Sequence, residues 1–302
     1  MSKLLTAGGM ALMILLASPC GVSAAESLAQ AKVAAPADAT LLPSAFHVDG
    51  NQFIFLKVSI DSAPEVWMLL DTGTSPSVIR LDYARSLGVK LGPPANDGAG
   101  AGGSGFQTYP VKVANLRVGT VALENVAFEA EDFGPPGPDG LPIAGVLGYS
   151  FLAGKALVLD YPAGKARLIK AGQTVCGVPF QLVSDVPTVS LSVAGQTVSA
   201  AIDSGGAYEL LLTPTSAGRL GLAGSMAAGG DYPGTGYGGK VVVKVNMSGP
   251  DFAIGETIRR KPVVAYLPLP AALPVDGAVG TSFLKDYKVT IDYSAQRICF
   301  EQ

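Results

Sequence analysis

Two short segments of the sequence each place a carboxylate on a turn at the end of an apolar stretch. The first reads Leu-Leu-Asp-Thr-Gly-Thr-Ser at residues 69–75, and the second reads Ala-Ile-Asp-Ser-Gly-Gly at residues 201–206. A single copy is typical of an ordinary surface turn, because Asp, Ser, Thr and Gly all favour turns. Two carboxylates, Asp71 and Asp203, could instead meet as a pair that shares one proton, one member serving as base and the other as acid.

The two segments belong to a longer repeat. An interval of 132 residues separates Asp71 from Asp203, and the same interval separates Gly148 from Gly280, the glycines of two matching apolar-Gly motifs. An Asp-Tyr dipeptide near the end of each copy keeps this register. Solenoid repeats are only about 20 to 50 residues long, so this duplication indicates two copies of one domain-sized unit. The shared register disfavours the plain alternative of a secreted β protein with duplicated turns.

With these motifs the sequence resembles the bilobal aspartic peptidases of the pepsin and retropepsin kind, over about residues 45 to 302. In that family each half supplies an Asp-Thr/Ser-Gly loop, a later apolar-Gly motif, a helix and a last strand. The resemblance implies an aspartic-type peptidase, a hydrolase in which Asp71 and Asp203 activate a water molecule against a peptide or protein substrate. It implies neither a metal nor another cofactor. The compact halves are closer to the retropepsin-like bacterial enzymes than to pepsin.

The resemblance also implies roles for the residues around the two acids. They would hold the loops together or permit a close backbone approach: Thr72, Gly73, Thr74, Ser204, Gly205, Gly148 and Gly280. In one departure from the family, Thr74 can donate to Asp71, whereas Gly206 has no hydroxyl for Asp203. We therefore expect Asp71 to ionise first and Asp203 to hold the shared proton. The same departure keeps open a catalytically silent two-lobed protein that binds a protein or glycan ligand.

The elements that must position the acids read mainly as short strands. Residues 53–70 alternate like a hairpin that leads into Asp71. Short helices are expected at 81–87 and after Thr213, which stands as an N-cap before Pro214. The predicted fold is therefore all-β, the two-lobed aspartic-protease fold with internal duplication and short helices.

Each half also contains a glycine-rich stretch, at 98–105 and at 229–239, followed by strand-like residues. Both stretches satisfy G-x-G-x-x-G, but a dinucleotide fingerprint needs a strand before it and a helix after it. We therefore expect no cofactor there and predict a mobile hairpin or loop in each half, where the family places its flap. The aromatic side chains that could cover a bound peptide are Phe106, Tyr109, Tyr232 and Tyr237.

The N-terminal residues indicate export to the periplasm or the medium. Residues 1–24 combine a positive start, a short apolar run and small residues, a pattern typical of a signal peptide. Residues 25–44 are rich in Ala, Ser and Pro and predict a flexible lead or short pro-segment. The N-terminal lobe would then span 45–172 and the C-terminal lobe 173–302.

Composition limits the partners. The formal net charge is -3 without a Lys/Arg cluster, which argues against nucleic acid, and no later stretch is long enough for stable membrane insertion. We expect a monomer. His47 has no ligand cluster near it, which argues against a metal site. Cys176 and Cys299 bracket the C-terminal lobe, so export predicts a disulfide between them, with two separate buried thiols as the alternative.

Overall fold

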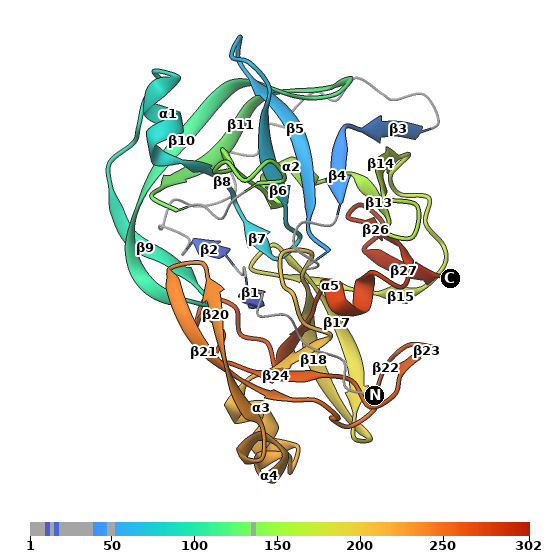
Figure 1. Ribbon diagram of the computed structural model, residues 1–302. Coiled ribbons are helices and arrows are strands. Elements are labelled where there is room, and N and C mark those ends of the chain that lie inside the picture. The colour runs from blue at the N-terminus through green and yellow to red at the C-terminus, as the bar shows by residue number, and fades with distance from the viewer. Residues whose placement is uncertain (1–9, 13–14, 18–38, 47–51, 134–136) are drawn as a thin grey trace.

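The computed structural model describes residues 10–12, 15–17, 39–46, 52–133 and 137–302 (Figure 1). Strands dominate these residues, and the longest helices among them have only six residues. The all-β, two-lobed architecture with short helices that the sequence predicts is therefore confirmed. Most of the predicted signal peptide and lead, together with His47, lies outside the described residues. Within them, no helix is long and apolar enough to cross a membrane.

The N-terminal lobe is built on a ten-stranded sheet in the order β4-β5-β6-β12-β8-β11-β10-β9-β2-β7. Its strands are β2 (Leu15–Ala17), β4 (Ser44–Phe46), β5 (Ile54–Ile60), β6 (Val66–Leu70), β7 (Thr74–Ser75), β8 (Ser77–Arg80), β9 (Ala95–Gly100), β10 (Gly103–Val118), β11 (Val121–Glu131) and β12 (Gly145–Leu147). Helices α1 (Leu81–Ser86) and α2 (Tyr149–Leu152) accompany this sheet. Phe55 pairs with Leu69 across the antiparallel β5–β6 hairpin, so the expected hairpin leads into Asp71.

The C-terminal lobe is built on an eleven-stranded sheet in the order β1-β20-β21-β24-β19-β25-β18-β17-β22-β23, with β16 beside β17. Its strands are β1 (Met10–Leu12), β16 (Gln181–Val183), β17 (Val186–Val193), β18 (Gln196–Ile202), β19 (Leu210–Leu212), β20 (Gly230–Gly236), β21 (Gly239–Asn246), β22 (Phe252–Ile254), β23 (Thr257–Arg259), β24 (Val264–Tyr266) and β25 (Gly277–Val279). Helices α3 (Pro214–Arg219), α4 (Ala223–Ala227) and α5 (Thr281–Leu284) complete it. Thr213 is the predicted N-cap of α3 and accepts the Ser216 N–H at 3.1 Å.

The duplication is visible in the strand pairings. In the N-terminal lobe β12 is parallel to β6 and antiparallel to β8, and β8 is parallel to β11. In the C-terminal lobe β25 stands in the same relation to β18 and β19, and β19 is parallel to β24. Because β6 and β18 occupy equivalent places, the loops that carry Asp71 and Asp203 emerge from equivalent strand ends.

A third, six-stranded sheet joins the lobes in the order β15-β27-β26-β13-β14-β3. Its strands are β3 (Ala39–Leu42), β13 (Ala156–Asp160), β14 (Lys165–Ile169), β15 (Val178–Pro179), β26 (Lys288–Asp292) and β27 (Arg297–Glu301). The β13–β26 pair crosses from one lobe to the other, with Leu157 opposite Ile291. Residues 39–42 were assigned to the flexible lead from their composition, and this part of the assignment is wrong: they form β3, with Leu42 buried.

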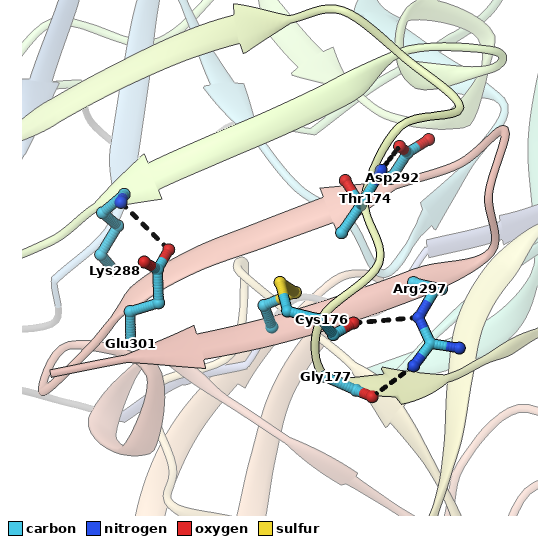
Figure 2. Close-up of a disulfide and its surroundings, with 8 residues drawn as sticks. Thr174, Cys176, Gly177, Lys288, Asp292, Arg297 and Glu301 are labelled. Carbon is cyan, nitrogen blue, oxygen red and sulfur yellow. Dashed lines mark hydrogen bonds and ion pairs between the residues drawn. A yellow bond between two sulfur atoms is a disulfide. The ribbon is translucent and has the colours of Figure 1, made fainter.

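The Cys176–Cys299 disulfide predicted from the sequence is present, with the two Cα atoms 5.8 Å apart (Figure 2). The Arg297 guanidinium donates to the backbone carbonyls of Cys176 and Gly177 at 2.9 and 2.6 Å. Asp292 accepts the backbone N–H of Thr174 at 3.2 Å. These contacts fix the start of the C-terminal half against its last two strands.

Candidate active site

Asp71 and Asp203 lie at the ends of β6 and β18, in the interface between the lobes. Each is fully buried, and each loop is fastened to the strand beside it: the Asp71 N–H donates to Leu147 O at 3.0 Å, and the Asp203 N–H donates to Val279 O at 2.9 Å. The preceding strand residues are apolar and buried, which anchors both loops in the cores of their lobes.

Reciprocal hydrogen bonds hold the two loops together across the interface. The Thr72 hydroxyl donates to Ile202 O at 2.6 Å, and the Ser204 hydroxyl donates to Leu70 O at 2.9 Å. Each hydroxyl also accepts the other residue's backbone N–H, at 3.1 and 3.0 Å. Thr72 and Ser204 therefore make the contact that the family resemblance implies for them.

The glycine of each loop lies against the carboxylate of the other lobe. A Cβ atom on Gly73 would lie 3.0 Å from Oδ1 of Asp203, and one on Gly205 would lie 2.5 Å from Oδ2 of Asp71. A side chain at either position would therefore push into the opposite acid. Because neither glycine has a side chain, each carboxylate can lie against the loop of the other lobe.

The glycines of the apolar-Gly motifs lie directly behind the two loops. A Cβ atom on Gly148 would lie 2.3 Å from the backbone oxygen of Thr74, and one on Gly280 would lie 2.3 Å from that of Gly206. Gly148 and Gly280 therefore occupy equivalent positions in the two lobes, as Gly73 and Gly205 do.

Each carboxylate accepts hydrogen bonds from a backbone N–H and from a hydroxyl. Asp71 accepts the Gly73 N–H on Oδ1 at 2.7 Å and the Thr74 hydroxyl on Oδ2 at 2.6 Å. Asp203 accepts the Gly205 N–H on Oδ1 at 2.8 Å.

The expectation that Asp203 lacks a hydroxyl donor is wrong. The phenol of Tyr208 donates to Oδ2 of Asp203, the oxygen equivalent to the one that Thr74 contacts on Asp71. Tyr208 was not predicted from the sequence, because only the residue directly after the triplet, Gly206, was considered as a donor. The available signal was a second departure from the repeat: Tyr208, two positions after Gly206, corresponds to Pro76 in the first copy.

Burial perturbs both acids, and the charge of Asp71 perturbs Asp203 as well. Burial raises the pKa of Asp71 to about 6, against the opposing hydrogen bonds from Thr74 and Gly73. Burial also raises the pKa of Asp203 well above its ordinary value, the charge of Asp71 raises it further, and the Tyr208 hydrogen bond opposes the rise. The charge of Asp71 thus disfavours ionisation of Asp203, so the pair keeps one proton over part of the pH range in which it titrates.

Two hairpins from opposite lobes meet beside this pair. The glycine-rich stretches form the tips of β9–β10 and β20–β21, which approach each other in Figure 1. The Gly102 N–H donates to Tyr237 O at 2.7 Å, and the rings of Phe106 and Tyr237 lie 4.9 Å apart. Because a strand follows each G-x-G-x-x-G run, neither has the helix of a dinucleotide site.

The other two aromatic residues proposed for the flaps, Tyr109 and Tyr232, lie away from the contact between the hairpin tips. Tyr109 packs against the core of the N-terminal lobe, where it pairs with Ala130. Tyr232 is 36% exposed and pairs with Val243 on the β20–β21 hairpin. Of the four candidates, Phe106 and Tyr237 form the contact between the hairpins. Phe133, which was not a candidate, joins them, with its ring 5.1 Å from that of Tyr237.

An extended strand, β2, lies between the first loop and its hairpin and belongs to the residues for which the sequence predicts a signal peptide. β2 pairs in parallel with β7, placing Leu15 opposite Thr74, and antiparallel with β9, placing Leu16 opposite Ala99. β1 pairs in parallel with β20 on the other hairpin. Backbone groups on both hairpins and on β7, directly after the Asp71 loop, are thus aligned to pair with an extended chain.

A second group of acids lies on β11, on the face opposite the lobe core. Burial, then the charge of Asp97, raises the pKa of Glu129 to about 7. Burial, then the charges of Glu129 and Asp97, raises the pKa of Glu131 to about 9. Oε2 of Glu131 has no hydrogen-bond partner among the described residues. Also within that part of the chain, no three His, Cys, Asp or Glu side chains are grouped to hold a metal.

Comparison with known proteins supports an aspartyl protease family. Residues 56–151 match the family model described as aspartyl protease. The matched stretch runs from the β5–β6 hairpin through the Asp71 loop to Gly148 and the start of α2. No curated protein matches the chain.

Proposed function

We propose that this protein is an aspartic endopeptidase that hydrolyses peptide bonds with a water molecule activated between Asp71 and Asp203. The observation that carries the proposal is the buried pair of carboxylates, each supplied by one lobe and each facing the glycine of the other loop. The aspartyl protease match of residues 56–151 supports the same class of reaction.

The different pKa shifts of the two acids support different roles for them. Asp71, with its pKa raised to about 6, ionises first and takes a proton from the water as the oxygen attacks the peptide carbonyl. Asp203 keeps its proton and donates it to the carbonyl oxygen, giving a neutral tetrahedral intermediate. On collapse, Asp71 passes its proton to the leaving nitrogen, and Asp203 recovers one from the intermediate's hydroxyl.

An extended peptide or protein segment fits the geometry beside the pair. β2 shows that Thr74, Ser75 and residues 98–100 can pair with one strand at the same time. A substrate in that place would gain main-chain hydrogen bonds without a requirement for particular side chains. Phe106 and Tyr237 would lie over it, because they join the tips of the two hairpins.

The remaining expectations belong to this proposal as well. Export to the periplasm or the medium, with removal of a signal peptide, accords with the Cys176–Cys299 disulfide. A monomer is sufficient, because one chain supplies both carboxylates. The silent binding protein loses its main support, since the donor that Gly206 cannot supply comes from Tyr208.

The test is peptide cleavage across a pH series with purified protein. We expect cleavage between an acid limb near pH 6, where Asp71 ionises, and a basic limb where Asp203 loses its proton, together with inhibition by a hydroxyl-containing transition-state mimic. Asp71→Asn and Asp203→Asn should each lower kcat by at least about a thousandfold. Asp61→Asn is the matched control, because Asp61 lies on an exposed turn of the N-terminal lobe at positive φ, which Asn tolerates. Full activity in either dyad variant would refute the proposal, and so would a folded wild type that binds peptides without cleaving them.

A further inference from the structure

The hydroxyl donors to the two carboxylates come from different places in the repeat. Thr74 lies three positions after Asp71, whereas Tyr208 lies five positions after Asp203. Two departures from the repeat therefore occur together: a glycine replaces the threonine, and a tyrosine replaces Pro76. The glycine leaves room for the tyrosine ring, and the tyrosine supplies the hydroxyl that the glycine lacks.

Gly206 is a glycine for reasons of space. A Cβ atom there would lie 2.4 Å from Cε1 of Tyr208 and 2.5 Å from Oδ2 of Asp203. Its φ does not fall in the left-handed region, so the backbone conformation alone would accept another residue. The tyrosine ring occupies the volume that a side chain at position 206 would fill.

The ring of Tyr208 is held on several sides. It is 2% exposed and belongs to an apolar cluster of the C-terminal lobe that includes Ala201, Leu211 and Ala278. The backbone oxygen of Tyr208 accepts the N–H of Ser282, near the start of α5, at 3.2 Å. The phenol therefore reaches Asp203 from a ring that the apolar cluster of the C-terminal lobe holds in place, whereas the Thr74 hydroxyl lies three positions after Asp71, at the start of β7.

We propose that Tyr208 is the positioning residue of Asp203: its phenol holds the carboxyl group toward Asp71, and Gly206 and Tyr208 act as one coupled unit. This inference rests on the proposed function. Burial and the negative charge of Asp203 raise the pKa of Tyr208, so the phenol remains a donor throughout the range in which the acids titrate. The other titratable groups whose charges interact with Asp203 are Asp71 and Tyr161.

The decisive variant is Tyr208→Phe, which keeps the ring and removes the donor. A hydrogen bond to a carboxylate favours its charged form, so its loss raises the pKa of Asp203. We expect the basic limb of the kcat/KM profile to move to higher pH by about one to two units, and kcat to fall. The acid limb should stay, because Asp71 keeps its Thr74 and Gly73 donors.

A rescue pair tests the coupling. Tyr208→Ala removes donor and ring together and should show the same movement of the basic limb. Adding Gly206→Ser to it places a hydroxyl beside Asp203, as Thr74 does beside Asp71, and should return the limb toward the wild-type position. The Asp203 carboxyl group must rotate to admit the new Cβ, which would otherwise lie 2.5 Å from its Oδ2. Gly206→Ser alone should lower both stability and activity, since the ring still fills that space.

The control is Tyr266→Phe, another buried phenol of the same lobe, whose hydroxyl lies 3.1 Å from Ser225 Oγ. It should leave both limbs in place. A second readout needs no turnover: titration of the Asp203 carboxyl by ¹³C NMR in wild type and Tyr208→Phe. A higher Asp203 pKa in the variant supports the positioning role even if no peptide is cleaved, which separates this inference from the proposed function. An unchanged carboxyl titration, or a Tyr208→Phe profile equal to that of Tyr266→Phe, would overturn it.

Discussion

Thr72→Val should weaken the docking of the two lobes while preserving the shape of the loop. Valine matches threonine in size but loses the donor to Ile202 O at 2.6 Å and the acceptor of the Ser204 N–H at 3.1 Å. Both bonds are buried. Two lost bonds with their partners left inside the protein correspond to about 2 to 5 kcal/mol of unfolding free energy.

The assay is urea denaturation in a double-mutant cycle with Ser204→Ala, followed by kcat/KM for each variant at equal folded fraction. Because the two hydroxyls bond reciprocally, the cycle should give a coupling energy of about 1 kcal/mol or more. Thr188→Val is the matched control: Thr188 is a buried threonine whose hydroxyl donates to Val186 O at 3.1 Å within one lobe. Equal losses for the two threonine variants, with an additive cycle, would show that the reciprocal bonds do not link the lobes energetically.

Three further predictions concern the glycine contact, a buried acid and the disulfide. Gly205→Ala should abolish cleavage, because its Cβ would lie 2.5 Å from the opposite carboxylate, whereas Gly218→Ala, with open space around it, should keep wild-type kcat. Glu131 has a folded-state pKa raised from 4.5 to about 9, so the folded state binds its proton more tightly and loses stability as pH rises between those values; Glu131→Gln should raise Tm at pH 8 but not at pH 4. Replacing Cys176 and Cys299 by serine opens a link across 123 positions, and denaturation should show a loss of about 4 to 5 kcal/mol, whereas no loss would contradict the chain-entropy account.

The sequence alone predicts the loops of the site because duplication leaves a signal that needs no structure. Asp71 and Asp203 occur in the same register as Gly148 and Gly280, and short strands flank all four. The disulfide follows from the expected export and from the positions of its cysteines. These features depend on local pattern and on spacing, both of which can be read along the chain.

What the sequence does not predict depends on contacts across space. The phenol of Tyr208 replaces a missing hydroxyl only because a glycine leaves room for its ring. Phe106 and Tyr237 meet because two lobes bring their hairpins together, a relation that neither stretch encodes by itself. Glu131 alternates with core residues as a surface strand residue would, yet it is 2% exposed in the folded protein.

The interlobe position of the acids also sets the time at which activity can arise. Domains generally fold as units, the N-terminal one first during synthesis. A growing chain that has only reached residue 172 contains Asp71 but not Asp203, and its Thr72 has neither Ile202 nor Ser204 to bond. Under the proposed function, cleavage therefore begins only after the second half has been made and has docked. The unfinished chain is then safe from its own activity.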